Sequence, residues 1–487
     1  MVGRLPEESV KASLVSASPA SHALPCCVEA PPSFVPKARY ALEMLLMPLG
    51  IAPVWVGRGE LSGAGLYYGP AGEGLPSSVV RAPLREDTLA YFDSGEPYRA
   101  ERVRWVEWEE EPWPVLFGGA RTGEEDLIAS AFFWLSGWQE ATIRERDRHG
   151  RFPHRVSLQA RLGTTARPAV DAYREMLAGR LAAAGAPVRR RTWGGRAWAL
   201  CPTHDVDYLR KWRPGLVRRE VVHHLLLNHR REAAADRLRR FGRFLADALR
   251  PGDVYRRALE RMQAETARRG GTATFFLKAG AHGPHDVPYA LDGRYLRRRL
   301  DALAGAGFEV GLHPSYHAYR HPGYLREERD RLAAVTGRAP ASVRQHYLRF
   351  EAPATPRLHH RLGFRIDATL GFAEHEGFRH GTCHPFRYFD LLENRPLDVW
   401  EMPLTLMDAT LFNLRSLDAG QARAVTGDLL DTCRRFGGAA VCLWHNTLWD
   451  EMDCPGWGDH FLDTLEAALA RGACVASLSD VLQSYLT

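Results

Sequence analysis

The sequence has few cysteines, and none of them are spaced as in a zinc ribbon or a disulfide framework. Eight cysteines occur in 487 residues, without a C-x-x-C pair, and only Cys26 and Cys27 lie close together. This pattern excludes a small disulfide-stabilised domain and is typical of free thiols in a reducing compartment. The sequence also lacks the run of ~20 apolar residues that a membrane helix needs. Its best candidate, residues 40–57, is interrupted by Glu43 and two prolines, so we expect no transmembrane segment.

A secretory signal is also missing, because no continuous apolar segment follows the first charged residues. We therefore expect a cytoplasmic protein. Lysine is scarce, with only Lys11, Lys37, Lys211 and Lys278 among 64 basic residues, so arginine accounts for most of the positive charge behind the net +6. No helix-turn-helix, zinc-finger or RNA-binding signature accompanies that charge, and we expect no nucleic-acid partner.

Composition shifts divide the chain into three parts. Residues 1–35 are rich in Ser, Ala and Pro and predict a flexible tail. Residues 36–190 mix helical and strand-like patterns and predict a smaller α/β domain, whose role the sequence leaves open. A Gly-Ala-Pro segment followed by consecutive arginines predicts a linker near residue 190.

From residue 191 to residue 487, short apolar runs alternate with helical stretches. The runs cover 197–201, 273–277, 308–312, 342–346, 364–366, 397–402, 439–443 and 473–478. Seven or eight such units predict a parallel α/β fold, most simply a deformed (β/α)7-8 barrel. The active site of such a barrel lies at the carboxyl ends of its strands, so the polar residues that follow these runs are candidates for a site.

Two carboxylates and two histidines follow the first and third runs. Asp205 and Asp207 are one residue apart, and one could hold a cation while the other takes a proton; loop-capping aspartates are the alternative. His313 and His317 have the i, i+4 spacing that places two imidazoles on one face of a helical turn, although chance also produces such pairs in a chain with 20 histidines. With Asp207 they would form a two-histidine, one-carboxylate set, which is common in catalytic zinc sites.

Two further polar residues follow later runs. Arg344 could orient a neighbouring carboxylate, or it could form a purely structural ion pair. His445 stands among apolar residues, where a histidine is often part of the core, but its place after an apolar run matches that of the other candidates.

Taken in order, these segments resemble the polysaccharide deacetylase family (carbohydrate esterase family 4, the nodulation-deacetylase homology domain) over residues 197–487. The likeness rests on motifs that follow one another in the family's order: Thr203–Asp207, Ala273–Phe276, Glu309–His317, Arg344–Tyr347, Asp367 and Leu443–His445. Val206, His346 and Gly371 depart from the family pattern, and His346 stands where the third motif has a proline. Residues 131–136 and 147–152 are similar to an uncharacterised domain that precedes such barrels in some bacterial proteins.

The resemblance implies a role for each matching residue. Asp207, His313 and His317 would hold a divalent cation, most simply Zn²⁺, with Co²⁺, Ni²⁺ or Mn²⁺ as alternatives. Asp205 would act as the general base, and Arg344 would orient it. His445 would protonate the leaving amine, with Asp367 tuning its pKa. The backbone N–H of Tyr347 would help to bind the oxyanion.

A basic insertion separates the first two motifs. Residues 211–270 are predicted to be helical, and the span 210–270 holds 17 Lys plus Arg against 7 Asp plus Glu. It could attract an anionic substrate such as a nucleotide-linked or lipid-diphosphate-linked sugar, or make peripheral contact with an anionic membrane. A solvated arginine-rich helix is the simpler alternative.

The sequence therefore predicts a metal-dependent deacetylase that removes N-acetyl groups from an amino sugar in a polysaccharide, glycolipid or nucleotide-sugar intermediate. Two alternatives stay open. The same fold could hydrolyse a small non-sugar amide or imide, or it could be catalytically inactive and serve as a scaffold or binding subunit in glycan assembly. The sequence does not indicate an oligomeric state.

Overall fold

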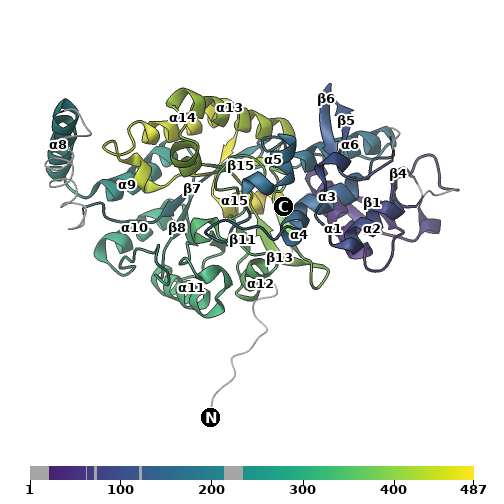
Figure 1. Ribbon diagram of the computed structural model, residues 1–487, viewed down its shortest axis with the longest axis horizontal. Helices are drawn as coiled ribbons and strands as arrows, with labels where there is room; N and C mark the ends of the chain where they lie inside the picture. The colour runs from purple at the N-terminus through teal and green to yellow at the C-terminus, as the bar shows by residue number, and fades with distance from the viewer. Residues whose placement is uncertain (1–20, 62, 71–73, 120–122, 213–233) are drawn as a thin grey trace, which may run out of the picture.

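The structure, a computed structural model, describes residues 21–61, 63–70, 74–119, 123–212 and 234–487. At its centre is a curled sheet of ten strands flanked by helices (Figure 1). The strand order is β12-β13-β11-β10-β9-β8-β7-β15-β14, and β16 pairs with β7. The strands are β7 (Ala199–Val206), β8 (Thr274–Leu277), β9 (Glu309–Leu312), β10 (Ser342–Val343), β11 (Ile366–Asp367), β12 (Phe386–Asp390), β13 (Arg395–Glu401), β14 (Leu404–Met407), β15 (Ala439–Leu443) and β16 (Cys474–Val475).

The mixed α/β class is as predicted, but closure of the predicted barrel is not found. Neighbouring strands from β13 through to β14 are parallel, whereas β12 runs antiparallel to β13. The strand path ends at β12 and β14, which do not pair with each other in the described residues. The β12–β13 hairpin occupies the edge where another parallel strand would be needed, so the sheet remains an open curl.

Helices after the strands cover the outside of the curl. They are α9 (Val254–Arg268), α10 (Arg294–Gly305), α11 (Pro322–Thr336), α12 (Ala354–Arg361), α13 (Ala419–Phe436), α14 (Trp457–Ala470) and α15 (Leu478–Leu486). Local sequence defines several of their ends. At α13, Asp418 and Gln421 form a capping box, and Gly437 ends the helix with a φ of 65°. At α11, Pro322 occupies the first turn, where a missing N–H costs nothing.

The insertion is helical where it is described. Here α8 (Ala234–Ala248) lies at one end of the molecule in Figure 1, where its Asp247 pairs with Arg257 of α9, and α9 packs beside the sheet. The prediction for residues 213–233 lies outside the described residues. No helix in the described part of the chain combines the length and apolarity needed to cross a bilayer.

The N-terminal region contains a second, smaller parallel sheet with the order β2-β1-β3-β4. Its elements are β1 (His22–Val28), α1 (Val35–Leu46), β2 (Ile51–Trp55), β3 (Leu66–Gly69), β4 (Val80–Pro83), α2 (Glu86–Ser94), the hairpin β5 (Arg104–Trp108) and β6 (Glu111–Val115), and the helices α3 (Leu127–Leu135), α4 (Trp138–Thr142), α5 (Leu158–Leu162) and α6 (Ala169–Ala183). The predicted tail of residues 1–35 is therefore wrong in its second half. β1 lies between β2 and β3, and its Leu24 and Cys26 are fully buried. The local sequence does not predict this strand, because the strands that pair with it lie further along the chain.

The two sheets share one hydrophobic core, and buried polar contacts join them. A single cluster of buried side chains runs from Leu24 to Tyr485. Arg379 forms a paired contact with the Glu140 carboxylate at 2.7 and 2.6 Å, with both side chains buried. The hydroxyl of Tyr40 donates to the backbone oxygen of Arg387 at 2.6 Å. The predicted boundary near residue 190 therefore separates two sheets and not two independent cores.

Asp126 in the N-terminal region gives stability a dependence on pH. Its carboxylate caps α3 by accepting from the N–H of Ala129 at 2.8 Å and accepts from the hydroxyl of Tyr68 at 2.9 Å. Burial raises the pKa of Asp126 to about 7 from a usual value near 3.8. The folded chain thus binds a proton that the unfolded chain has released between about pH 4 and pH 7, so this group destabilises the fold as the pH rises through that window.

We expect Asp126→Asn to remove this pH dependence while keeping the cap, since asparagine caps helices about as well as aspartate. Between pH 5 and pH 8, the variant should lose about 2 to 3 kcal/mol less unfolding free energy than the parent. Urea unfolding of both proteins at the two pH values measures this difference. If the unfolding free energies of the two proteins changed equally with pH, this would contradict the raised pKa of Asp126.

Candidate functional site

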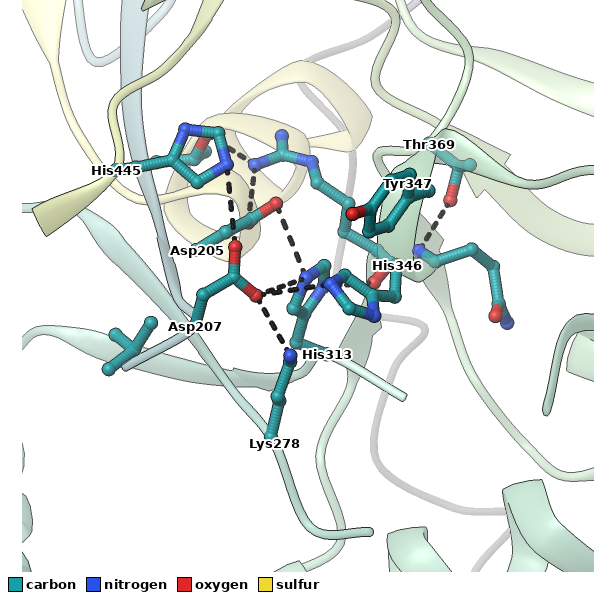
Figure 2. A network of polar contacts seen from close by, with 12 residues as sticks. Asp205, Asp207, Lys278, His313, His346, Tyr347, Thr369 and His445 are labelled. Atoms are coloured by element: carbon teal, nitrogen blue, oxygen red, sulfur yellow. Dashed lines mark hydrogen bonds and ion pairs between the residues drawn. The ribbon is translucent and has the colours of Figure 1, made fainter. Parts of the chain in front are cut away.

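The carboxyl ends of four parallel strands bring the candidate residues together (Figure 2). Asp205 is near the end of β7 and Asp207 follows it, His313 follows β9, Arg344 follows β10, and His445 follows β15. A cavity of about 340 Å³ opens onto this group. The parallel sheet thus places side chains that are up to 240 residues apart in one site, as the pattern of apolar runs predicted.

Three buried ligand atoms converge in this cavity. Oδ1 of Asp207 lies 3.5 Å from Nε2 of His313 and 3.3 Å from Nε2 of His346. Although this carboxylate oxygen is buried, no donor with hydrogen-bonding geometry reaches it in the described part of the chain. Ligand atoms of the three residues all lie within 4.8 Å of one another.

In both histidines, the hydrogen bond made by Nδ1 determines which way Nε2 faces. Nδ1–H of His313 donates to the backbone oxygen of Arg344 at 2.7 Å, and Nδ1–H of His346 donates to Oδ1 of Asp286 at 2.8 Å. Because carbonyl and carboxylate oxygens only accept, each ring carries a proton on Nδ1, and when neutral it directs the lone pair of Nε2 at Oδ1 of Asp207. Three electron-rich atoms facing one another suit a divalent cation, and imidazoles oriented through their outer N–H groups are typical of metal ligands. The residues present therefore fit a metal.

Lys278, a residue that sequence reasoning did not select, also reaches this carboxylate. It directly follows β8 and is buried, with its ammonium 3.1 Å from Oδ1 of Asp207 and 4.0 Å from Oδ1 of Asp286. Burial would raise the pKa of Asp207, but the charge that His346 carries when protonated, the close approach of both histidine rings and the charge of Lys278 hold that pKa well below its usual range. Asp207 is therefore an ionised carboxylate at neutral pH.

The structure places His317 away from the three converging atoms, which corrects the predicted ligand set. The i, i+4 spacing places two imidazoles on one face only in a helical turn, but the chain leaves β9 without forming one, and His317 is exposed at the start of a short 3-10 helix. Its Nδ1 faces the guanidinium of Arg349 at 3.5 Å. His346 takes the expected place of His317. The signal for it was present in the sequence, since His346 ends an apolar run and replaces the proline of the third motif.

Asp205 and Arg344 are in contact. A guanidinium nitrogen of Arg344 donates to Oδ1 of Asp205 at 3.2 Å and to the hydroxyl of Thr203 at 2.7 Å, and Nε donates to the backbone oxygen of Ala368 at 2.7 Å. Arg344 is fully buried, so its position is defined by these acceptors. The second carboxylate oxygen of Asp205 lies 3.7 Å from Nε2 of His313, facing the converging atoms.

His445 is held by Asp408, which follows β14. Nδ1–H of His445 donates to Oδ1 of Asp408 at 2.7 Å, and the backbone N–H of His445 donates to Oδ2 at 2.6 Å. Nε2 of His445 points toward Asp207, 3.9 Å from its Oδ2. Burial lowers the pKa of His445, but the Asp408 carboxylate, with Asp207 and Asp205 behind it, raises the pKa to about 9. His445 is therefore a proton donor at neutral pH.

Asp367 has a different environment from the one predicted. It is fully buried and accepts from the N–H of Thr369 at 3.0 Å, from His359 Nδ1 at 2.8 Å and from the hydroxyl of Tyr388 at 3.1 Å. None of these partners is His445. Asp408 makes the contact that the resemblance had implied for Asp367, and it was missed because the run of β14 was not recognised in the sequence.

Tyr347 lies on the wall of the cavity. Its φ is 62°, which is uncommon for a residue other than glycine, and its side chain is 37% exposed. Its ring packs against those of His149, His285 and Tyr316, with centroids 4.8, 5.0 and 5.5 Å away. The predicted role of its backbone N–H remains a prediction.

In a second buried group, Asp171, Cys383 and His384, the possible ligand atoms also lie within 4.8 Å of one another. The guanidinium of Arg174 already lies 2.9 Å from both Oδ1 of Asp171 and Nδ1 of His384. The N–H of Cys383 donates to the other oxygen of Asp171 at 2.8 Å. This group is therefore a satisfied ion-pair network that joins α6 to the large sheet.

Comparison with known proteins gives a family match for one segment of the chain. A model described as a family of unknown function (DUF7033) matches residues 91–185, which lie in the N-terminal region. No curated protein matches the chain.

Several solved structures are similar to about three fifths of this chain. A polysaccharide deacetylase from Mycobacterium smegmatis is 18% identical with a TM-score of 0.39, over 60% of this chain and 91% of that one. The peptidoglycan deacetylase PdaC from Bacillus subtilis is 10% identical with a TM-score of 0.30, over 60% and 92%. A CE4 family pseudoenzyme from Bacillus anthracis is 11% identical with a TM-score of 0.29, over 58% and 65%. With TM-scores below 0.5, these similarities leave the function to be inferred from the site itself.

Proposed function

We propose that this protein is a metal-dependent hydrolase that removes an N-acetyl group from an amino sugar. The observation that carries the proposal is the convergence of Asp207, His313 and His346 on one buried point, with an Asp205–Arg344 pair and a His445–Asp408 pair in the same cavity. Amide hydrolysis needs this combination, since water must lose a proton as it attacks and the leaving nitrogen must gain one.

Asp207, His313 and His346 would hold the metal, and zinc suits one carboxylate with two imidazoles. When bound, such an ion acts as a Lewis acid that makes water a nucleophile near neutral pH and polarises the acyl carbonyl. Lys278 contributes a further positive charge beside Asp207.

The remaining side chains divide the proton transfers between them. Asp205 accepts the proton of the attacking water, and Arg344 orients its carboxylate. His445 donates a proton to the leaving amine, and Asp408 fixes its tautomer by taking the Nδ1–H. The backbone N–H of Tyr347 stabilises the developing oxyanion.

Metal binding separates the two possible ligand sets. We expect close to one metal ion per chain in the parent and in His317→Ala, and an affinity about 100-fold lower or worse in His346→Ala, because only the last variant removes a converging nitrogen. Titration calorimetry with Zn²⁺ on the metal-depleted full chain measures this, and the two His→Ala variants serve as matched controls. Loss of binding in His317→Ala with retention in His346→Ala would restore the ligand set expected from the sequence.

Lys278 supports a second candidate function. Its ammonium already neutralises Asp207 at 3.1 Å, so the chain could keep this arrangement without a metal and act as a binding subunit in glycan assembly. Absence of Zn²⁺, Co²⁺, Ni²⁺ and Mn²⁺ binding by the parent would favour this second function over the hydrolase.

A further inference from the structure

A turn from the N-terminal region forms part of the wall of the catalytic cavity. Arg148, His149 and Arg151 line the same cavity as Asp205 and His445. The turn, residues 147–151, lies within the segment that matches the family of unknown function. The N-terminal region therefore reaches the site of a sheet that begins some 50 residues later in the chain.

The turn is rigid by its own contacts. The N–H of Asp147 donates to the backbone oxygen of Arg151 at 2.9 Å, and Gly150, whose φ of 76° favours glycine, closes the bend. One carboxylate oxygen of Asp147 accepts from the N–H groups of His149 and Arg151 at 2.8 and 2.9 Å. The other oxygen receives two guanidinium contacts from Arg151, at 2.8 and 2.7 Å. The Arg151 side chain is thus oriented before it meets the large sheet.

Arg151 meets a strained segment of the site. Its remaining terminal nitrogen donates to the backbone oxygen of Tyr347 at 3.0 Å. Tyr347 and Leu348 have φ values of 62° and 54°, and two consecutive left-handed residues other than glycine persist only where surrounding contacts hold them. The same short segment, residues 346–348, carries His346 and the N–H of Tyr347.

A second arginine, Arg349 after segment 346–348, also binds the turn. Arg349 donates from Nε to the backbone oxygen of His149 at 2.7 Å and from a terminal nitrogen to the backbone oxygen of Tyr316 at 2.7 Å. The ring of His149 contacts the hydroxyl of Tyr316 at 3.0 Å through Nδ1 and packs 4.8 Å from the ring of Tyr347. Hydrogen bonds from Arg151 to the backbone oxygen of Tyr347 and from Arg349 to that of His149 therefore hold the turn against the strained segment.

We propose that residues 147–151 belong to the active site and that Arg151 is a positioning residue, which holds segment 346–348 in the conformation that directs His346 and the N–H of Tyr347 into the cavity. This assigns a role to the N-terminal region, namely completion of the catalytic cavity. The catalytic consequence rests on the proposed hydrolase function, whereas the conformational consequence does not.

The conformational consequence is tested by hydrogen exchange on the full chain. The N–H of Leu348 is bonded to the backbone oxygen of Gln345 at 2.9 Å and reports opening of the strained segment. Loss of a hydrogen bond from a charged donor should speed its exchange about 10-fold or more in Arg151→Met. The matched control is Arg155→Met, in the same part of the chain, with a 71% exposed side chain that pairs with Glu145; here exchange should stay as in the parent.

The catalytic consequence is tested by acetate release from the same proteins. We expect Arg151→Met to lower kcat about 10- to 100-fold with KM changed less than threefold, and Arg151→Lys to recover part of the loss, because lysine can still donate to the Tyr347 oxygen. Unchanged exchange at Leu348, or faster exchange spread equally over β11, would overturn the proposal. Faster exchange at Leu348 in a parent that releases no acetate would support the positioning role and count against the hydrolase function alone.

Discussion

Asp205→Asn lowers kcat for acetate release about 10²- to 10⁴-fold, which is the usual contribution of a positioned acid or base. Asparagine has the same shape and can still accept from Arg344, but it cannot take a proton. The carboxylate of Asp205 is buried, has one oxygen 3.2 Å from the Arg344 guanidinium, and directs the other toward Nε2 of His313 at 3.7 Å. The measurement is steady-state release of acetate from a panel of N-acetylated amino sugars and oligosaccharides, with small amides and imides as the comparison.

Two controls make this result specific. Asp205→Asn should bind Zn²⁺ within a few fold of the parent and unfold at a similar temperature, because Asp205 is not one of the three converging ligands. Activity within threefold of the parent would rule out Asp205 as the base. Hydrolysis of small amides or imides but not of N-acetyl sugars would keep the mechanism and change the substrate.

The second large effect is expected at Asp408. Asp408→Asn should lower kcat about 10- to 10³-fold, since it removes the charge that keeps His445 protonated and no longer fixes the His445 tautomer through the 2.7 Å contact to Nδ1. His445→Gln should lose at least as much, and the double variant little more than His445→Gln, because the two residues act as a unit. Steady-state kinetics of the three variants measures this.

Asp367→Asn provides the matched control for Asp408→Asn. It removes the same charge from the aspartate that the sequence had selected, which accepts from Thr369, His359 and Tyr388 and does not contact His445. We expect Asp367→Asn to lower stability while kcat per metal-loaded chain stays within threefold of the parent. A larger loss of kcat in Asp367→Asn than in Asp408→Asn would contradict the structural assignment and favour the prediction from sequence.

Much of the large sheet was predictable from local patterns. Buried parallel strands are short, apolar and evenly spaced, and each of the eight predicted runs overlaps a strand, namely β7, β8, β9, β10, β11, β13, β15 and β16. The edge strands β12 and β14 were missed, because their burial comes from neighbours distant in the chain. Because β14 was not predicted, the sequence did not place Asp408 at the end of a strand.

The sequence by itself determined at which strand ends the candidate residues lie. Asp205, Asp207, His313, Arg344 and His445 each follow or end a strand of the parallel sheet, and parallel strands bring such ends to one edge. Only the tertiary structure decided which of these side chains meet. His346 replaces His317 because the chain after β9 does not turn into a helix, and Asp408 replaces Asp367 because β14 lies next to β15. Arg151 reaches the site from a region whose own pattern gives no sign of it, since contacts between distant segments depend on packing in three dimensions, which local periodicity does not encode.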